Sequence, residues 1–133
     1  MIYLDSSALI KFVRAEAETM ALRSWRAALA PGTALVTNEV AELEITRTLR
    51  RAGVDHQQVP YVTGQVLRGV HLVDLTRTVL ARAMTYRGRL GSLDAIHLAT
   101  ADPFRDELTE FVTYDGEQRA AAADIGLPTA RPR

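Results

Sequence analysis

Four acidic residues stand out because each lies in an apolar stretch, where an unpaired carboxylate is costly to bury. They come from widely separated segments of the 133-residue chain, at Asp5, Glu44, Asp94 and Asp115. Hard divalent cations prefer oxygen ligands, so carboxylates gathered from distant segments suggest a cation site. A bound metal can activate a water molecule for hydrolysis. The pattern indicates a metal-dependent enzyme, provided that the fold brings the four side chains together.

Two of these acids follow predicted strands. Asp5 comes after the apolar run at residues 1–4, and Asp115 comes after the strand predicted at residues 111–113. The carboxyl ends of parallel strands meet at one edge of an open α/β sheet, where ligands bind. Each aspartate also fits the N-cap of the helix that follows it. The run from Asp115 to Gln118 further fits a capping box, with Gln118 reaching back to the cap.

Hydroxyl side chains accompany both strand ends. Ser6 and Ser7 could hold the Asp5 carboxylate in one rotamer, or bond the next backbone turn. Thr113 could bond an acid across the site, or simply end its strand. The sequence leaves these roles open.

Glu44 lies in the apolar helix predicted at residues 39–52, two residues after a second acid, Glu42. At about 100° per residue the two acids point in nearly opposite directions, so only one can face a given pocket. Glu44 falls on the arc of Val40 and Ala41 and is therefore favoured for the pocket, with Glu42 as the fallback. A surface ion pair of Glu44 with Arg47, three residues later, is the alternative.

Asp94 lies at the start of a helix that is apolar nearly all round, from residue 92 to residue 101. Such a helix is buried. A carboxylate there needs a cation, strong donors or a proton, and the first helical turn supplies part of that stabilisation. We interpret His97 on the same helix as a hydrogen-bonded residue of the core or rim and not as a ligand, because magnesium prefers oxygen.

The pattern of apolar runs and turn residues predicts an α/β fold. Asn38, Thr76 and Ser92 are suitable caps for three of the helices. Short apolar strands that alternate with helices favour a parallel sheet covered on both faces, with extra helices inserted after the second strand. We expect strands at residues 2–5, 34–37, 72–75, 111–113 and 127–129, and helices at 7–13, 18–29, 39–52, 55–67, 77–87, 93–104 and 118–124.

Composition restricts the function classes. The chain has no cysteine, which excludes disulfides, thiolate metal sites and cysteine nucleophiles and fits a cytoplasmic location. No apolar run approaches the ~18 residues that a membrane span needs, and no signal peptide is visible. The formal net charge is zero, so contact with a polyanion would depend on local arginine clusters and a bound cation. Two clusters qualify, and either would otherwise be solvated helix surface: Arg47, Arg50 and Arg51, and Arg82, Arg87 and Arg89.

Taken together, these motifs resemble those of a known family. The order and spacing of the acids, and above all the Ser-Leu-Asp-Ala-Ile-His-Leu-Ala-Thr-Ala segment at 92–101, resemble the PIN-domain ribonucleases, specifically the VapC toxins of bacterial type II toxin–antitoxin pairs. The resemblance covers essentially the whole chain. It implies a single PIN domain over residues 1–133, a three-layer α/β/α sandwich with a mainly parallel central sheet.

The resemblance also implies an activity. Asp5, Glu44, Asp94 and Asp115 would bind Mg²⁺, with Mn²⁺ as the alternative, and a metal-activated water would cleave RNA, often a tRNA or rRNA stem–loop. Either Asp94 or Asp115 would orient that water. Whether one or two ions bind, and whether Asp115 is essential, stays open here. Hydroxyls expected to support the carboxylates are those of Ser6, Ser7 and Thr113.

The partners implied by the family are a second copy of the chain and a VapB-type antitoxin bound near the active site. Phe12, Val13 and Trp25 could line a docking groove for the antitoxin, although they suit a core equally well. Two other functions remain to be weighed. One is a non-catalytic PIN-like module that binds RNA or protein. The other is a phosphatase or phosphoacceptor with Asp5 as nucleophile, which the neighbouring serines and the single lysine, Lys11, disfavour.

Overall fold

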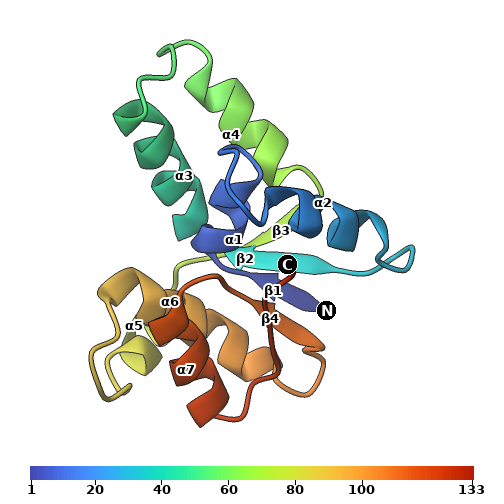
Figure 1. The fold of residues 1–133 in the computed structure, drawn as a ribbon. Helices are drawn as coiled ribbons and strands as arrows, with labels where there is room; N and C mark the ends of the chain where they lie inside the picture. The colour runs from blue at the N-terminus through green and yellow to red at the C-terminus, as the bar shows by residue number, and fades with distance from the viewer.

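The computed structural model describes all residues from Met1 to Arg133. A five-stranded sheet has the order β3-β2-β1-β4-β5, and every neighbouring pair is parallel. Seven α-helices and a short 3₁₀ helix connect the strands (Figure 1). The strands are β1 (Ile2–Leu4), β2 (Leu35–Asn38), β3 (Val70–Val73), β4 (Glu110–Val112) and β5 (Thr129–Ala130). The helices are α1 (Ser6–Lys11), α2 (Thr19–Ala27), α3 (Val40–Arg51), α4 (Val59–Leu67), α5 (Arg77–Ala83), α6 (Ser92–Ala101), η1 (Asp102–Phe104) and α7 (Gly116–Asp124).

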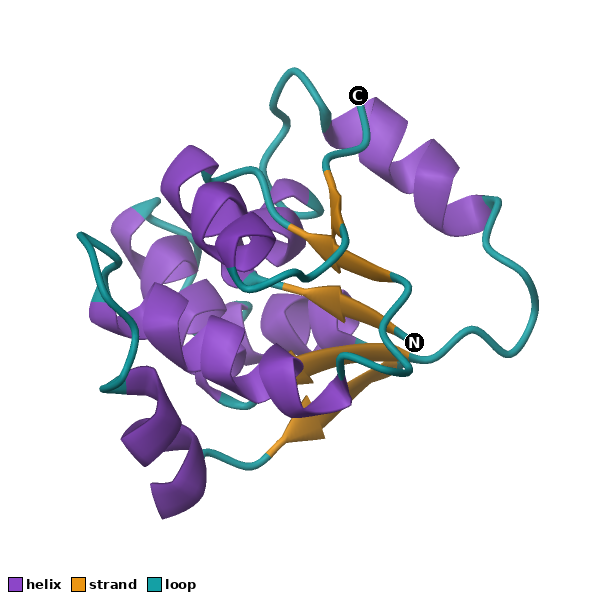
Figure 2. Cartoon of the chain, turned by 90° about the horizontal axis from the view of Figure 1, so that it is seen from below, coloured by secondary structure: helices purple, strands orange, loops and turns teal.

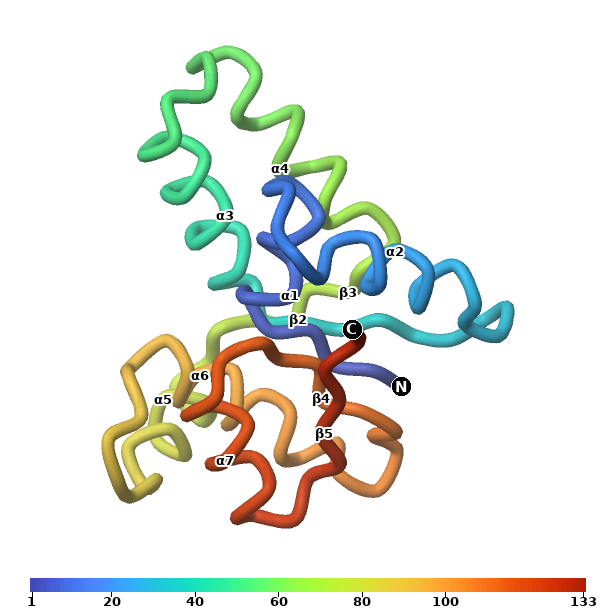
Figure 3. Tube along the Cα trace, in the orientation of Figure 1, coloured from blue at the N-terminus to red at the C-terminus, as the bar shows by residue number.

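The sheet separates two helical layers. Helices α1 to α4 lie on one side of the strands and α5 to α7 on the other, as both the ribbon and the Cα trace show (Figures 1 and 3). Viewed from below, the strands run side by side between helices (Figure 2). The expected three-layer α/β/α sandwich is confirmed, with a sheet that is parallel throughout.

Strand alternation explains the two layers. Ile2 and Leu4 of β1 belong to a cluster of buried apolar residues with α1, α2, α3 and α4. Tyr3, between them, belongs to a second cluster with Phe111 and with residues of α6 and α7. Successive side chains of a strand point to opposite faces, so one three-residue strand contributes to both cores. No helix combines the length and apolar character needed to cross a membrane.

The order of the strands decides where a site can form. From β1 the chain builds outward through β2 to β3, then returns to the other side of β1 for β4 and β5. The direction of winding therefore reverses between β1 and β4. In open α/β sheets, ligands bind at the carboxyl ends of the strands beside such a reversal. Asp5 directly follows β1, and Asp115 lies three residues after β4.

Several predicted boundaries were wrong by a few residues. Strand β3 begins at Val70, two residues before the prediction, because Gly69 turns the chain with a φ of 78° and the register with β2 then pairs Leu35 with Val70. Helix α4 begins at Val59 and not at residue 55, since the Asp55 carboxylate caps a local turn by accepting from the Gln57 N–H. Pro60 then occupies the first turn of α4, where a missing N–H is harmless.

Other helices also end earlier than predicted: α1 ends at Lys11 and not at residue 13, and α2 ends at Ala27 and not at residue 29. Helix α5 ends at Ala83 and not at residue 87. Helix α6 ends at Ala101 and continues as the 3₁₀ turn η1 at Pro103, because proline cannot donate to the preceding helical turn. Thr76 caps α5 as expected by accepting from the Val79 N–H. Gly91, and not Ser92, occupies the N-cap position of α6.

Candidate active site

Asp5 is almost fully enclosed at the end of β1, with 1% of its surface exposed. Its Oδ1 accepts from Ser7 Oγ at 2.6 Å and from the Ala8 N–H at 3.1 Å. Asp5 is therefore the N-cap of α1, as one of its two interpretations predicted. Burial raises the pKa of the carboxyl, and the hydrogen bonds from Ser7 and Thr113 oppose that rise. An N-cap carboxylate that is almost fully buried, as in Asp5, is unusual.

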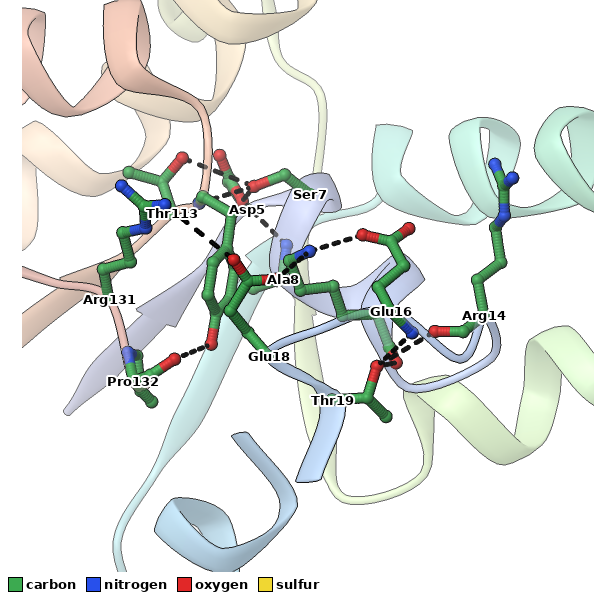
Figure 4. Close-up of polar contacts among 12 residues, drawn as sticks. Asp5, Ser7, Ala8, Arg14, Glu16, Glu18, Thr19, Thr113, Arg131 and Pro132 are labelled. Atoms are coloured by element: carbon green, nitrogen blue, oxygen red, sulfur yellow. Dashed lines mark hydrogen bonds and ion pairs between the residues drawn. The ribbon is translucent and has the colours of Figure 1, made fainter. Parts of the chain in front are cut away.

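Ser7 joins the ends of β1 and β4. Its Oγ accepts from the Tyr114 N–H at 2.9 Å and lies 3.4 Å from Thr113 Oγ1 (Figure 4). Thr113 Oγ1 in turn accepts from the Asp115 N–H at 3.1 Å. The hydroxyls of Ser7 and Thr113 thus connect the chain around Asp5 to the chain around Asp115.

Glu44 turns inward from α3. Its Oε2 accepts from Ser6 Oγ at 2.7 Å, and its Oε1 lies 2.7 Å from His97 Nε2. The alternative ion pair with Arg47 is absent, and the fallback residue Glu42 is exposed. The helical arc that favoured Glu44 over Glu42 therefore predicted the inward side chain correctly.

Asp94 lies in the first turn of α6 and is partly buried. Burial is the main cause that raises the pKa of its carboxyl to about 6, and the negative charges of Asp115, Asp5 and Glu44 add to the rise. The ring of His97 acts in the opposite direction. No lysine or arginine forms an ion pair with Asp94. The charges of the other three acids thus act on this carboxyl with no strong base to balance them.

Asp115 is the N-cap of α7, and its Oδ1 accepts from the Gln118 N–H at 3.0 Å. The predicted capping box is wrong in its second half. The side-chain amide of Gln118 does not return to the cap but donates to the backbone carbonyl of Asp94 at 3.0 Å. This contact is available because α6 and α7 pack on the same face of the sheet.

One network of hydrogen bonds and nearby charges therefore connects the four acids, but their side chains do not surround a common point. No three of the carboxylates and histidines are placed to hold a single ion as the side chains stand. Convergence on a shared ion stays a prediction.

Comparison with known proteins decides the family. The PIN-domain profile matches residues 2–124. The chain belongs to the PIN-domain family. Ribonuclease VapC47 of Mycobacterium tuberculosis (strain CDC 1551 / Oshkosh) is 38% identical over 134 residues, which cover 99% of this chain and 97% of that protein. The crystal structure of VapC20 of M. tuberculosis, described as a sarcin–ricin loop cleaving toxin, matches with a TM-score of 0.77 at 18% identity, covering 99% of this chain and all of that one.

A structure of VapBC-1 from nontypeable Haemophilus influenzae matches with a TM-score of 0.74 at 14% identity and covers 98% of both chains. At these identities the solved structures establish the fold of this PIN-domain chain, while the VapC relative places it among the VapC ribonucleases. PIN-domain ribonucleases are metal-dependent enzymes in general. The family predicted from the sequence is confirmed.

Two groups beside these acids were not predicted from the sequence. Tyr3 was assigned only to a strand, yet its hydroxyl reaches His97 Nδ1 at 2.7 Å across the core. Gln118 was assigned only to a capping box with Asp115 on its own helix. The sequence did carry one signal for Tyr3. Its hydroxyl belongs to a short apolar strand that is expected to be buried, and a buried hydroxyl needs an internal hydrogen-bond partner. Nothing in the sequence indicated the direction of the Gln118 side chain.

Proposed function

We propose that this chain is a Mg²⁺-dependent endoribonuclease that acts as the toxin of a VapBC-type pair. The observation that carries the proposal is the environment of the Asp94 carboxylate. Its pKa is raised to about 6 by burial and by three further carboxylates from distant segments, with no lysine or arginine to offset them. A site that concentrates uncompensated carboxylates on one sheet edge is suited to a divalent cation.

Asp5, Glu44, Asp94 and Asp115 would hold the ion. Their oxygens are the ligands that Mg²⁺ prefers, and Mn²⁺ accepts the same set. Because no three of the carboxylates and histidines are placed around one point, binding would require side chains that are not already held, above all that of Asp94, to rotate toward Asp5 and Glu44. When bound, the ion would lower the pKa of a water molecule and offset negative charge that develops at the phosphodiester.

The protein side chains have separate tasks in this proposal. Ser7 and the Ala8 N–H keep Asp5 in its rotamer, and Ser6 and His97 do the same for Glu44. Either the Asp94 or the Asp115 carboxylate would orient the attacking water beside the ion. Asp115, whose Oδ1 already caps α7, is then a ligand or an orienting group.

A structure similar to this chain is described as a toxin–antitoxin complex from Klebsiella pneumoniae, and by analogy we propose a VapB-type antitoxin as partner. The homodimer is proposed only because the family resemblance implies it. VapC20 is described as cleaving the sarcin–ricin loop, so a structured loop of rRNA or tRNA is the class of RNA to test. Phe12, Val13 and Trp25, considered as an antitoxin groove or as core, are partly buried and pack against the core of the α1–α4 layer.

The direct test is RNA cleavage by Asp5→Asn and Asp94→Asn variants, with labelled stem–loop RNA in Mg²⁺ and in EDTA. Both variants should lose metal-dependent cleavage and keep the wild-type circular dichroism spectrum. Asp106→Asn is a matched control, because Asp106 is exposed and lies in the turn after η1. Cleavage at the wild-type rate by folded Asp5→Asn or Asp94→Asn would refute the proposal. RNA binding without cleavage by the wild type would favour the non-catalytic module.

A further inference from the structure

The carboxylate of Glu44 is the only one of the four that is held at both oxygens by side chains. Ser6 Oγ donates to Oε2, and His97 Nε2 lies 2.7 Å from Oε1. Each carboxylate oxygen carries two lone pairs, so each still has one left for a cation. The partners thus fix the direction of the free lone pairs without using them up.

Behind His97, a buried chain of hydrogen bonds assigns the direction of each donor. The Asn38 N–H donates to the Tyr3 hydroxyl oxygen at 3.1 Å, since a backbone amide can only donate. The Tyr3 hydroxyl also lies 2.7 Å from His97 Nδ1. The Glu44 carboxylate can only accept, so His97 carries a hydrogen on Nε2, directed at Oε1, and in the neutral ring Nδ1 is then the acceptor for the Tyr3 hydroxyl.

The surroundings prevent the imidazole from turning away. Both His97 and Tyr3 have 1% or less of their surface exposed. The Tyr3 ring stacks on Phe111 at a centroid distance of 5.2 Å and meets the His97 ring edge-on at 5.8 Å. Asn38 is itself fixed by its side-chain amide, which donates to Thr100 Oγ1 at 3.0 Å. We call the hydrogen-bonded chain from Asn38 through Tyr3 and His97 to Glu44 the relay. Its members behind Glu44 belong to the core of the protein and not to a mobile surface group.

We propose that His97 and Tyr3 are positioning residues that present the Glu44 carboxylate to the divalent cation. This inference rests on the proposed function, because it takes Glu44 as a ligand. His97 lies one helical turn after Asp94 on α6, so a single helix carries one candidate ligand and the group that orients another. Polar groups that fix the orientation of ligating side chains commonly change metal affinity when they are removed.

The test is calorimetric titration of Mn²⁺ into RNA-free protein, which measures binding independently of cleavage. His97→Leu removes the donor at similar volume, whereas His97→Gln keeps an N–H donor in a similar place. Tyr3→Phe keeps the ring that stacks on Phe111 and removes only the hydroxyl. We expect Mn²⁺ affinity to fall about tenfold in His97→Leu and Tyr3→Phe, and His97→Gln to regain much of it.

A matched control removes a hydrogen-bonded tyrosine hydroxyl elsewhere. Tyr86 donates to Asp102 Oδ2 at 3.0 Å, on the α5–α6 side and without a path to Glu44. Tyr86→Phe should bind Mn²⁺ like the wild type even if it lowers the melting temperature. If His97→Leu does not fold, Tyr3→Phe decides the question.

Glu44→Gln separates the possible failures. If Glu44→Gln weakens Mn²⁺ binding while His97→Leu or Tyr3→Phe binds like the wild type, the relay has no positioning role and the inference is wrong. If Glu44→Gln itself binds Mn²⁺ like the wild type, the assignment of Glu44 as a ligand in the proposed function is wrong, and the inference falls with it. A loss in His97→Leu that His97→Gln does not restore would assign His97 a packing role only.

Discussion

The Gln118 side-chain amide donates to the backbone carbonyl of Asp94 across 3.0 Å. The same residue's backbone N–H is capped by Asp115 Oδ1, so Gln118 bonds to both Asp94 and Asp115. It is fully buried and bridges the first turns of α6 and α7. Gln118 therefore sets the spacing between two acids of the candidate site.

Replacing Gln118 by leucine should separate these two roles. The backbone cap stays, but the Asp94 carbonyl loses its donor, which costs about 1–2 kcal/mol of unfolding free energy, partly offset because Gln118 Oε1 is itself unpaired. RNA cleavage should fall as well, because α6 and α7 lose their link beside the acids. Urea denaturation and cleavage rates provide the measurements. Glu117→Gln, at the exposed neighbouring position, is the control. Wild-type stability together with wild-type cleavage in Gln118→Leu would contradict this role.

The raised pKa of Asp94 predicts the pH dependence of stability in the metal-free protein. The folded protein keeps this proton up to about pH 6, whereas the unfolded chain releases it near its ordinary value of 3.8. Between those values the folded state binds more protons, so the unfolding free energy falls as pH rises. Allowing for partial exposure, the Asp94 contribution is about 1 kcal/mol.

The measurement is urea denaturation in EDTA at pH values from 4 to 7.5. Asp94→Asn should be less sensitive to pH over this window and more stable than the wild type at pH 7.5. Asp5, whose pKa burial also raises, contributes with the same sign and remains in the variant. An equal decline in both proteins would show that Asp94 does not carry the effect.

Lys11, the only lysine in the chain, ties down the segment that follows α1. Its ammonium group pairs with Glu16 and with Glu18, and it lies 4.7 Å from the centre of the Tyr114 ring. Lys11→Met keeps the apolar stem and removes the charge. The loss should be about 1–2 kcal/mol, below the cost of a fully buried pair because both glutamates are partly exposed.

Hydrogen exchange in residues 12–18 should accelerate in Lys11→Met, since Glu18 would keep only its longer contact with Arg131 at 3.8 Å. RNA cleavage should fall much less than in Asp5→Asn. Lys11→Arg, which keeps the charge, should exchange more slowly than Lys11→Met. Exchange at the wild-type rate in Lys11→Met would show that the ion pairs do not hold this segment.

Three arginines of the two predicted clusters are free to contact phosphate. Arg82 pairs with Asp102 and Arg50 bonds His56, whereas the guanidinium groups of Arg47, Arg87 and Arg89 have no protein partner. In a chain of zero net charge, local groups of this kind must supply the attraction to RNA.

Replacing all three free arginines by alanine should weaken RNA binding by the cleavage-deficient Asp5→Asn protein and lower the salt slope, by up to about one unit for each lost phosphate contact. Fluorescence anisotropy at several salt concentrations measures both quantities. The guanidinium group of Arg68 also has no protein partner, but Arg68 lies just before the amino end of β3, whereas Asp5 and Asp115 follow the carboxyl ends of their strands. Arg68→Ala is therefore the control. An unchanged salt slope in the triple variant would exclude these arginines from the interface.

The sheet and its helices could be predicted from the sequence because each strand is a short apolar run bounded by turn residues, and because Asp5, Asn38 and Thr76 mark helix starts chemically. Asp5 and Asp115 indeed cap α1 and α7, and Asn38 accepts from the Val40 N–H at 2.9 Å. Helix ends were less accurate, since α5 has no buried residue to define its length.

The acids could be identified because a charged residue within an apolar run can be recognised from the sequence alone. Their partners could not. His97 contacts Tyr3, which is 94 residues away in the sequence, and Glu44, which is 53 residues away. Such contacts depend on which face of the sheet each element packs against. The direction of the Gln118 amide likewise depends on the approach of α6 to α7, which no local pattern encodes.

The convergence of the four acids on an ion is tested most directly by a crystal structure of the protein soaked in Mn²⁺, with an anomalous difference map. We expect one or two peaks ligated by oxygens of Asp5, Glu44 and Asp94, with or without Asp115, after rotation of side chains that now stand apart. A map with no peak at the carboxyl ends of β1 and β4, or with Mn²⁺ bound only by other residues, would contradict it.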